Sequence, residues 1–355
     1  MKKITLTTII ITLLISQLIN AQQTITTYST GYNAIEGITI NSNNEVFASE
    51  HYTGKVYSVD DDTGNKTEYA STGGGYANNI IFNSNDELFI TEPFMDKIFI
   101  KNSAADASVY VDININPNSF AIDSNGDLYL SSNSKVVKIN SDLTLSDYAT
   151  GFLYAEGMAF DSNDNLYLAD RSDRKLYKIL PDGTKTVVAS NIENIRGVAV
   201  DPNDKVYFTK KQTYPAEKKI LKYDPLTNTI TDFVTTNLET PRHIAIDNLG
   251  NMYVADRGSE TIIKISDPSL LDTTAITTEE QLTTFTIYPN PVTDILIIES
   301  NTTINNLSIY NELGQLLLKT NKTYTLDIST LTNGIYYLKI TNKTGNIEIK
   351  KIVKQ

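Results

Sequence analysis

The chain contains no cysteine and no tryptophan among its 355 residues, and it has only two histidines, His51 and His243. The lack of cysteine excludes disulfide bonds, thiolate metal ligands, thiol catalysis and the lipid-bearing cysteine of a bacterial lipoprotein. Acidic residues outnumber basic ones, which gives a formal net charge of −12. Because an anionic protein is repelled by phosphate backbones, we expect no nucleic acid among the partners.

An apolar run long enough to be a targeting segment is found only at the start of the chain. Lys2 and Lys3 precede a stretch that is most apolar from Ile9 to Ile15, and the small residue Ala21 follows. This order is typical of a secretory signal peptide, here residues 1–21. The alternative is a membrane anchor, but a membrane span needs about 20 mostly apolar residues, and this run is short and interrupted. We therefore expect no membrane span in the mature chain.

A repeated unit of about 40 residues governs the rest of the sequence. Each copy begins with a motif such as EGMAFDSNDNLYLAD, and the six copies start at Glu36, Asn78, Asn118, Glu156, Arg196 and Arg242. A β-branched strand, a tight turn rich in Asp, Asn, Ser and Gly, and a second strand of the Leu-Tyr-Leu type are followed by two more strands. A repeat of this length and content predicts a four-stranded propeller blade.

The two ends of the repeat array fit together. The sixth copy ends after its third strand, Thr261 to Ile265, and a spare strand, Thr24 to Tyr28, precedes the first copy. If the spare strand completes the sixth blade, the ring closes without an open sheet edge. The sequence therefore predicts an all-β protein. A six-bladed β-propeller over residues 22–268 is followed by a linker, residues 269–284, and a small Ig-like β-sandwich, residues 285–355.

The C-terminal segments TIYPNPVTDILII (286–298), LSIYNELGQLLLK (307–319) and LDISTLTNGIYYLKI (326–340), with the final KKIVKQ, resemble the type A sorting domain of the type IX secretion system. The resemblance implies that residues 285–355 address the chain to the type IX secretion machinery. The protein would then pass through the periplasm and be secreted or displayed on the outer-membrane surface. The alternative is an ordinary Ig-like adhesion module.

The sixth copy, PRHIAIDNLGNMYVADRGSETIIKISDP, resembles the NHL repeat, and the whole array is similar to NHL and gluconolactonase-like (regucalcin-like) propellers. Such propellers serve as binders, lactonases and lyases, so the resemblance implies a fold and leaves the function open. The first hypothesis is a module that binds a small-molecule, glycan or protein ligand at the channel mouth. The alternatives are a metal-dependent hydrolase or lactonase of gluconolactonase type and a streptogramin-lyase-like enzyme.

Two sets of loops share one face of a propeller, because the strands of a blade alternate in direction. The positions that enter each first strand are the predicted ligand-binding residues Glu36, Asn78, Asn118, Glu156, Arg196 and Arg242. The positions that leave each second strand are Glu50, Glu92, Ser132, Asp170, Lys210 and Asp256. Blades one to four thus offer oxygen ligands, and blades five and six add cations.

Oxygen ligands suit a hard cation, so the one cofactor considered is a divalent ion such as Ca²⁺. Gluconolactonase-like enzymes hold a divalent metal in the channel, and this resemblance places ligands at Glu36 and Asn118. Arg196 departs from the pattern, since an acidic ligand would be wanted there. Glu156 is the third metal candidate, because blades one and four face each other across a six-fold ring. Two facing carboxylates repel unless a cation lies between them, and the alternative is that Arg196 and Arg242 compensate their charge.

His51 and His243 are the candidates for catalysis, since histidine can act as a general base near neutral pH. Both belong to blades that become neighbours once the ring closes, although histidine also fills ordinary surface positions. Aromatic residues in the same loops, some of which we expect to contact a ligand, are Tyr32, Tyr52, Tyr76, Phe94, Phe152, Tyr154 and Tyr214. The acidic turns on the opposite face, such as Asp123 to Asp127, are predicted to be structural.

Overall fold

The computed structural model describes residues 23–102, 106–271, 285–300, 303–311, 315–321, 324–342 and 347–355. The predicted signal peptide lies outside these ranges, and so does most of the predicted linker. The chain divides into two compact units, Met1–Asp272 and Thr273–Gln355.

The first unit is built from four-stranded antiparallel sheets, each made by one copy of the repeat. Blade 1 contains β2 (Ile35–Ile40), β3 (Val46–Glu50), β4 (Lys55–Val59) and β5 (Lys66–Ser71). Blade 2 contains β6 (Ile80–Phe82), β7 (Leu88–Glu92), β8 (Lys97–Lys101) and β9 (Ser108–Asp112). Blade 3 contains β10 (Pro117–Ile122), β11 (Leu128–Ser132), β12 (Lys135–Ile139) and β13 (Leu145–Thr150).

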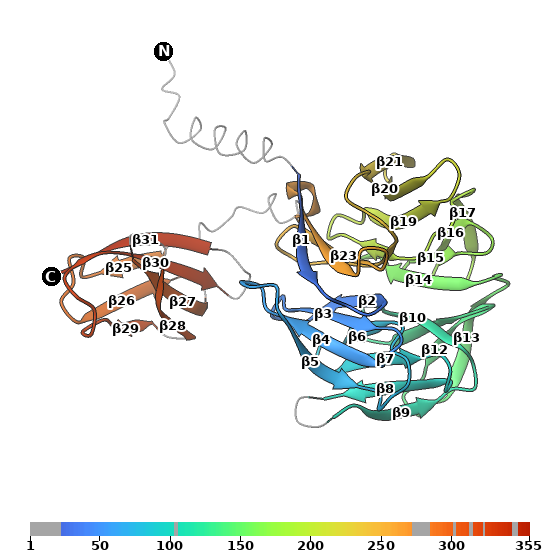
Figure 1. Cartoon of the computed structure of the whole chain (residues 1–355), viewed down its shortest axis with the longest axis horizontal. Helices are drawn as coiled ribbons and strands as arrows, with labels where there is room; N and C mark the ends of the chain where they lie inside the picture. Colours follow the sequence, from blue (N-terminus) through green and yellow to red (C-terminus); the bar gives the residue numbers. More distant parts are fainter. Residues whose placement is uncertain are drawn as a thin grey trace, which may run out of the picture. The chain divides into compact units, whose positions relative to one another are not determined.

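The remaining blades follow in chain order, as the colours of Figure 1 show. Blade 4 contains β14 (Ala155–Phe160), β15 (Leu166–Asp170), β16 (Lys175–Ile179) and β17 (Lys185–Ala189). Blade 5 contains β18 (Val198–Val200), β19 (Val206–Gln212), β20 (Glu217–Asp224) and β21 (Thr229–Val234). Blade 6 contains β22 (Pro241–Ile246), β23 (Asn251–Asp256), β24 (Thr261–Ser266) and, from the other end of the unit, β1 (Thr24–Thr30).

Strand β1 closes the ring by pairing antiparallel with β24, from Thr24 opposite Ser266 to Thr30 opposite Thr261. In Figure 1 the blue strand β1 accordingly lies beside the orange strands of the last blade. The ring of Tyr28 packs edge-on against that of Tyr253, with centroids 5.0 Å apart. The predicted closure of a six-bladed propeller is confirmed.

The hydrophobic cores of this unit lie between neighbouring blades. Between blades 4 and 5, for example, Tyr167 and Leu176 pack with Val206 and Phe208, all of them fully buried. Each blade is covered on both faces, so second strands such as β7 and β15 are buried along their whole length rather than at alternate residues. The innermost strands contact one another in order around the ring, from β2 through β6, β10, β14 and β18 to β22, and β22 in turn contacts β2. Their first residues are therefore gathered around one central channel.

The acidic turns at the ends of the first strands serve the fold, as predicted. The Oδ1 atom of Asp123 accepts hydrogen bonds from the amides of Asn125 and Asp127 at 3.0 and 2.9 Å. Neighbouring turns are also linked, because the hydroxyl of Ser124 donates to Asp164 at 2.7 Å. Their side-chain oxygens are occupied by the protein itself, which leaves no reason to assign them a calcium ion.

The second unit is a small β domain made of two sheets. One contains β25 (Phe285–Tyr288), β26 (Ile295–Ser300) and β29 (Thr325–Asp327), and the other contains β27 (Ile304–Tyr310), β28 (Leu316–Asn321), β30 (Gly334–Asn342) and β31 (Ile347–Lys354). Their core includes Leu296, Ile298, Leu307, Ile309 and Leu338. The chain leaving the propeller first forms a short 3₁₀ helix, Pro268–Leu270, which buries Leu270 against blade 6.

Candidate functional site

The first strands of the blades place the predicted ligand-binding residues at equivalent positions. Glu36, Asn118, Glu156 and Arg242 are each the second residue of their strand, in β2, β10, β14 and β22. In blades 2 and 5 the strand begins later, and Asn78 and Arg196 lie just before β6 and β18. Because the innermost strands surround the channel, the side chains at the start of these strands meet at one end of the channel.

Two glycines that follow site residues let the innermost strands approach one another closely. A Cβ atom on Gly157 would lie 2.1 Å from the carbonyl oxygen of Arg196, and one on Gly197 would lie 2.2 Å from that of Arg242. The amide of Gly157 instead donates a hydrogen bond to the Arg196 carbonyl at 3.0 Å. Any larger residue would push the blades apart, so glycine at these positions fixes the spacing of Glu156, Arg196 and Arg242 around the channel.

A cavity of about 230 Å³, here called the mouth, lies at this end of the channel. All six predicted ligand-binding residues line it: Glu36, Asn78, Asn118, Glu156, Arg196 and Arg242. His51, Phe94 and Tyr154 also line it, together with two arginines that the sequence argument did not single out, Arg171 and Arg257.

Guanidinium groups surround the two glutamates of the mouth. Arg257 Nη1 lies 2.6 Å from Glu36 Oε2, and Arg242 Nε lies 3.6 Å from the same oxygen. Arg196 connects the two carboxylates, since its Nη1 donates to Glu156 Oε1 and lies 3.8 Å from Glu36 Oε1. Arg171 Nε approaches Glu156 Oε2 at 3.6 Å. A continuous chain of alternating charges therefore crosses the mouth.

Burial and these arginines act in opposite directions on the charge of Glu36. Burial alone would raise its pKa, but the positive charges of Arg242, Arg196 and Arg257 outweigh that effect and hold the pKa of Glu36 below its ordinary value. Burial lowers the pKa of Arg242, although not enough to discharge a guanidinium. The mouth thus combines four positive charges with two negative ones.

Asn78 and Asn118 hold neighbouring blades together rather than presenting free amides. The side-chain amide of Asn78 donates to the carbonyl of Asn118 at 3.1 Å, and that of Asn118 donates to the carbonyl of Ala155 at 2.7 Å. The Asn118 side-chain oxygen accepts a hydrogen bond from the hydroxyl of Tyr154 at 3.4 Å. These residues position the entering loops of blades 2 to 4.

The acidic residues at the ends of the second strands do not supply ligand oxygens, contrary to the expectation from sequence. Asp170 accepts hydrogen bonds from the amides of Leu153 and Tyr154 at 2.7 and 2.9 Å. Glu50, Glu92 and Asp256 bind backbone amides of the loops before their first strands in the same way. Buried backbone amides in the loops between strands need hydrogen-bond acceptors, and these carboxylates provide them.

Arg171 and Arg257 follow directly after Asp170 and Asp256, at the same position in blades 4 and 6. Because the carboxylate of each preceding aspartate is turned toward the loop backbone, the arginine that comes next reaches the mouth. Their recurrence one residue after a structural aspartate is the sequence signal that could have identified them.

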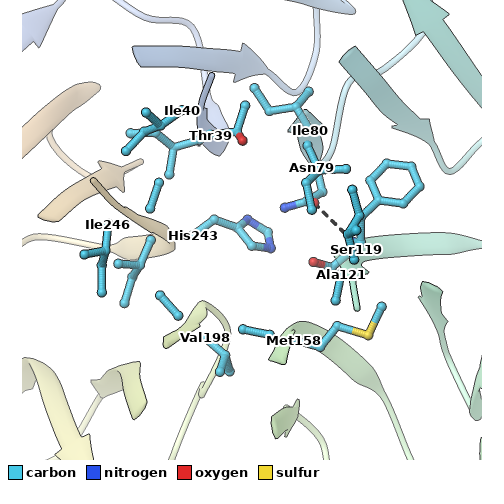
Figure 2. Close-up of a pocket in the computed structure, with 18 of the residues that line it drawn as sticks. Thr39, Ile40, Asn79, Ile80, Ser119, Ala121, Met158, Val198, His243 and Ile246 are labelled. Carbon is cyan, nitrogen blue, oxygen red and sulfur yellow. Dashed lines mark hydrogen bonds between the residues drawn. The ribbon is translucent and has the colours of Figure 1, made fainter. Parts of the chain in front are cut away.

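The two histidines lie in different places. His51 lines the mouth, and its Nδ1 atom is buried without a hydrogen-bond partner among the described residues. His243 lines a separate cavity of about 330 Å³ in the channel, and Figure 2 shows its ring directed into that space. The Nδ1 atom of His243 lies 3.0 Å from the carbonyl oxygen of Glu36. Since a carbonyl only accepts, Nδ1 carries the proton and Nε2 presents a lone pair to the channel.

Burial lowers the pKa of both His51 and His243. Each ring is therefore neutral near neutral pH, and neither adds to the charge of the mouth.

Of the aromatic residues predicted to contact a ligand, Phe94 and Tyr154 line the mouth, whereas Tyr32 and Phe152 are buried in cores between blades.

The arrangement around Glu36, Asn118 and Glu156 does not fit a divalent metal ion. Arg196 reaches both carboxylates, and the Asn118 oxygen is directed to Tyr154. Within the described ranges, no group of three or more His, Cys, Asp or Glu side chains is placed to hold a metal. Guanidinium groups thus provide the charge compensation that calcium was expected to provide, and a calcium titration decides between the two.

Comparison with known families identifies the second unit. Residues 286–355 match the family described as "Secretion system C-terminal sorting domain". The C-terminal unit is a sorting domain. It marks the chain for type IX secretion, to the cell surface or into the medium, and implies an interaction with the secretion machinery. Nowhere in the described residues is there a helix with the length and apolarity to cross a membrane.

The first unit is similar to solved propellers at low sequence identity. A virginiamycin B lyase from Staphylococcus aureus is 14% identical, with 69% of this chain and 99% of that chain covered and a TM-score of 0.55. A gluconolactonase from Xanthomonas campestris is 12% identical, with 69% and 90% covered and a TM-score of 0.60. An aldose sugar dehydrogenase from Streptomyces coelicolor is 15% identical, with 69% and 98% covered and a TM-score of 0.57. No curated protein matches the sequence. These likenesses show the propeller fold alone.

Proposed function

We propose that the exported propeller is a binding module that takes up an anionic ligand at the mouth of its channel. The observation that carries this proposal is a surplus of two positive charges: Arg171, Arg196, Arg242 and Arg257 stand against Glu36 and Glu156. This surplus occurs in a chain whose net charge is −12. A concave site of one sign focuses its field on a ligand of the opposite sign.

The arginines also retain unused hydrogen-bond donors. Each guanidinium has five N–H groups. Arg242 Nε is buried without a hydrogen-bond partner among the described residues. A buried unpaired donor costs about 1–3 kcal/mol, which a carboxylate, sulfate or phosphate oxygen in the mouth would recover. Charge-assisted hydrogen bonds from guanidinium to such oxygens are also stronger than neutral ones.

A catalytic role is the second candidate, and His51 is the observation that favours it. Among the described residues its Nδ1 atom has no hydrogen-bond partner, and the ring lines the mouth together with the guanidinium groups that would hold an anionic substrate. A neutral imidazole there is able to accept a proton, as in a lyase. Mass spectrometry of a ligand recovered after incubation distinguishes the roles. A binding module returns the ligand unchanged, whereas an enzyme converts it and His51→Ala abolishes the conversion.

Anion binding is tested on the purified protein by isothermal titration calorimetry with sulfate, at an ionic strength held constant with chloride. We expect saturable binding that Arg242→Gln weakens at least about tenfold, the loss of one charge-assisted hydrogen bond. Lys55→Gln is the matched control, because it also removes one cation, from an exposed pair with Glu68 on blade 1. Binding that both variants weaken equally contradicts the proposal, and so does the absence of binding both by sulfate and by the acidic saccharide and peptide probes named below.

A further inference from the structure

A second, smaller cavity adjoins the mouth on the side of blades 5 and 6. Its volume is about 180 Å³, and it shares Arg196 and Arg242 with the mouth. Lys211 also lines it and donates a hydrogen bond from Nζ to the hydroxyl of Thr240 at 2.8 Å. No salt bridge to Lys211 occurs within the described part of the chain, so its charge adds a further positive group next to the shared arginines.

The sizes of the two cavities suit a ligand that places one small unit in each. Pockets that enclose a drug-sized molecule usually measure about 300–1,000 Å³. The mouth and its neighbour are smaller, at about 230 and 180 Å³. Because Arg196 and Arg242 line both, a ligand with one unit in each cavity would have these two arginines beside both units.

The lining of the two cavities favours a ligand rich in hydroxyl groups. Pro93 and Phe94 are the only wholly apolar residues around the mouth, and Pro241 is the only one around its neighbour. Carboxylates, amides, imidazole and a tyrosine hydroxyl make up the rest of the mouth beside the arginines. The amides of Asn78 and Asn118 bind the protein itself, but the guanidinium groups still offer donors, and His51 Nδ1 and Glu156 Oε2 have no hydrogen-bond partner among the described residues. A lipid or an aromatic acid would leave most of these groups unpaired.

Flat aromatic faces lie at the rim on the side of blades 1 and 2, an area here called the aromatic shelf (Tyr52, Tyr76 and Phe94). Phe94 and Tyr52 are 67% and 59% exposed, although both carry large aromatic rings. Phe94 stacks on Tyr76 with ring centroids 4.0 Å apart, and Arg257 lies over the ring of Tyr52 at 5.1 Å. An exposed aromatic face beside a polar pocket is suited to the apolar side of a sugar-like ring.

We propose that the ligand is an acidic oligosaccharide, with one sugar in the mouth beside Phe94, the next in the cavity lined by Lys211, and acid groups on Arg196 and Arg242. The proposal rests on the proposed function, since it specifies which anion the mouth takes. Sugar hydroxyls match the polar lining, the C–H face of a sugar ring matches the aromatic shelf, and the acid groups match the surplus of positive charge.

The test measures affinities of the full exported protein by isothermal titration calorimetry. The probes are galacturonic acid, its α-1,4-linked trimer, the methyl ester of that trimer, a chondroitin sulfate tetrasaccharide, triglutamate and sulfate. We expect at least one of the two acidic oligosaccharides to bind tenfold or more tightly than the monomer and than triglutamate. The methyl ester, which keeps the rings and loses the charges, is expected not to bind.

Three variants separate the parts of the site. Lys211→Gln should weaken the oligosaccharide at least fivefold and leave galacturonic acid unchanged, because only the longer ligand reaches the second cavity. Phe94→Ala should weaken every saccharide and leave sulfate unchanged, since sulfate has no ring to stack. Lys55→Gln is the control for the loss of one surface cation, and it should leave the affinity for every probe unchanged.

The outcomes keep the two proposals apart. If sulfate binds but neither acidic oligosaccharide exceeds the monomer or triglutamate, the saccharide assignment is overturned and anion binding stands. Tighter binding of triglutamate would identify an acidic peptide as the ligand instead. If neither sulfate nor any acidic probe binds, the proposed function itself fails.

Discussion

Replacing Glu36 by glutamine tests the charge arrangement of the mouth, because it changes stability and anion affinity in opposite directions. The side chain is 3% exposed and faces three guanidinium groups, with N–O distances of 2.6, 3.6 and 3.8 Å. Glutamine keeps the shape of the side chain and removes its negative charge, so much of the positive charge of the three arginines is no longer compensated. The surplus of positive charge in the mouth rises from two to three.

The expected loss of stability is large. Removing one partner of a buried ion pair costs about 3–5 kcal/mol. For a unit of this size each kcal/mol shifts the melting temperature by roughly 2–4 °C, so the propeller transition should fall by roughly 6–20 °C. Circular dichroism melts of the wild type and Glu36→Gln measure this fall. Lys55→Gln, which breaks an exposed pair, should melt within about 2 °C of the wild type.

Sulfate and calcium then separate the two explanations of the mouth. A ligand at one hundred times its dissociation constant stabilises by about 2.7 kcal/mol. We expect sulfate to raise the melting temperature of Glu36→Gln more than that of the wild type, and calcium to raise neither. If instead calcium stabilises the wild type and Glu36→Gln loses the effect, the metal hypothesis holds. An unchanged melting temperature in the variant, or weaker sulfate binding, would refute the reasoning about charge.

Three further predictions concern closure, pH and export. Deleting residues 24–30 should destabilise the propeller by about 3 kcal/mol or more, because the β24 edge loses its ladder, and a denaturant titration showing no loss would contradict the closure argument. The folded pKa of His243 is lowered from 6.5, so stability should decline as pH falls below that value while the unfolded chain takes up a proton. His243→Asn, which retains a donor to Glu36, should flatten melting temperatures between pH 7 and 5, and an identical slope would argue against it. Truncation after residue 280 should leave the propeller folded but retained in the periplasm, and normal surface delivery in a fractionation experiment would count against the role of the tail.

The repeat made most of the fold predictable from sequence. Six copies with the same strand and turn pattern predict the same local structure six times. The spare strand that begins at Thr24 could pair with one open sheet edge, that of the incomplete sixth copy. The sequence also predicted that the side chains at the start of the first strands lie at the same height in the channel, because equivalent positions of a repeat occupy equivalent places around the ring. These side chains include Glu36, Glu156, Arg196 and Arg242. The direction of individual side chains was left undetermined.

That direction decided the chemistry of the site. Asp170 and Asp256 stand at the correct end of their strands, yet they bind loop amides, and the arginines that follow them reach the mouth instead. Sequence spacing could not show which of two adjacent residues satisfies the backbone. Nor could it show that Arg196 from blade 5 reaches both Glu36 and Glu156, which depends on the close approach that Gly157 and Gly197 allow.

The account is tested most directly by locating an anion in the mouth. Crystals of the protein grown or soaked in selenate, an analogue of sulfate, would reveal the anion through the anomalous scattering of selenium. The account predicts a selenate in the mouth in contact with the guanidinium group of Arg242, and its absence in crystals of Arg242→Gln. Selenate found only outside the mouth, or bound there equally in both proteins, would contradict the central claim.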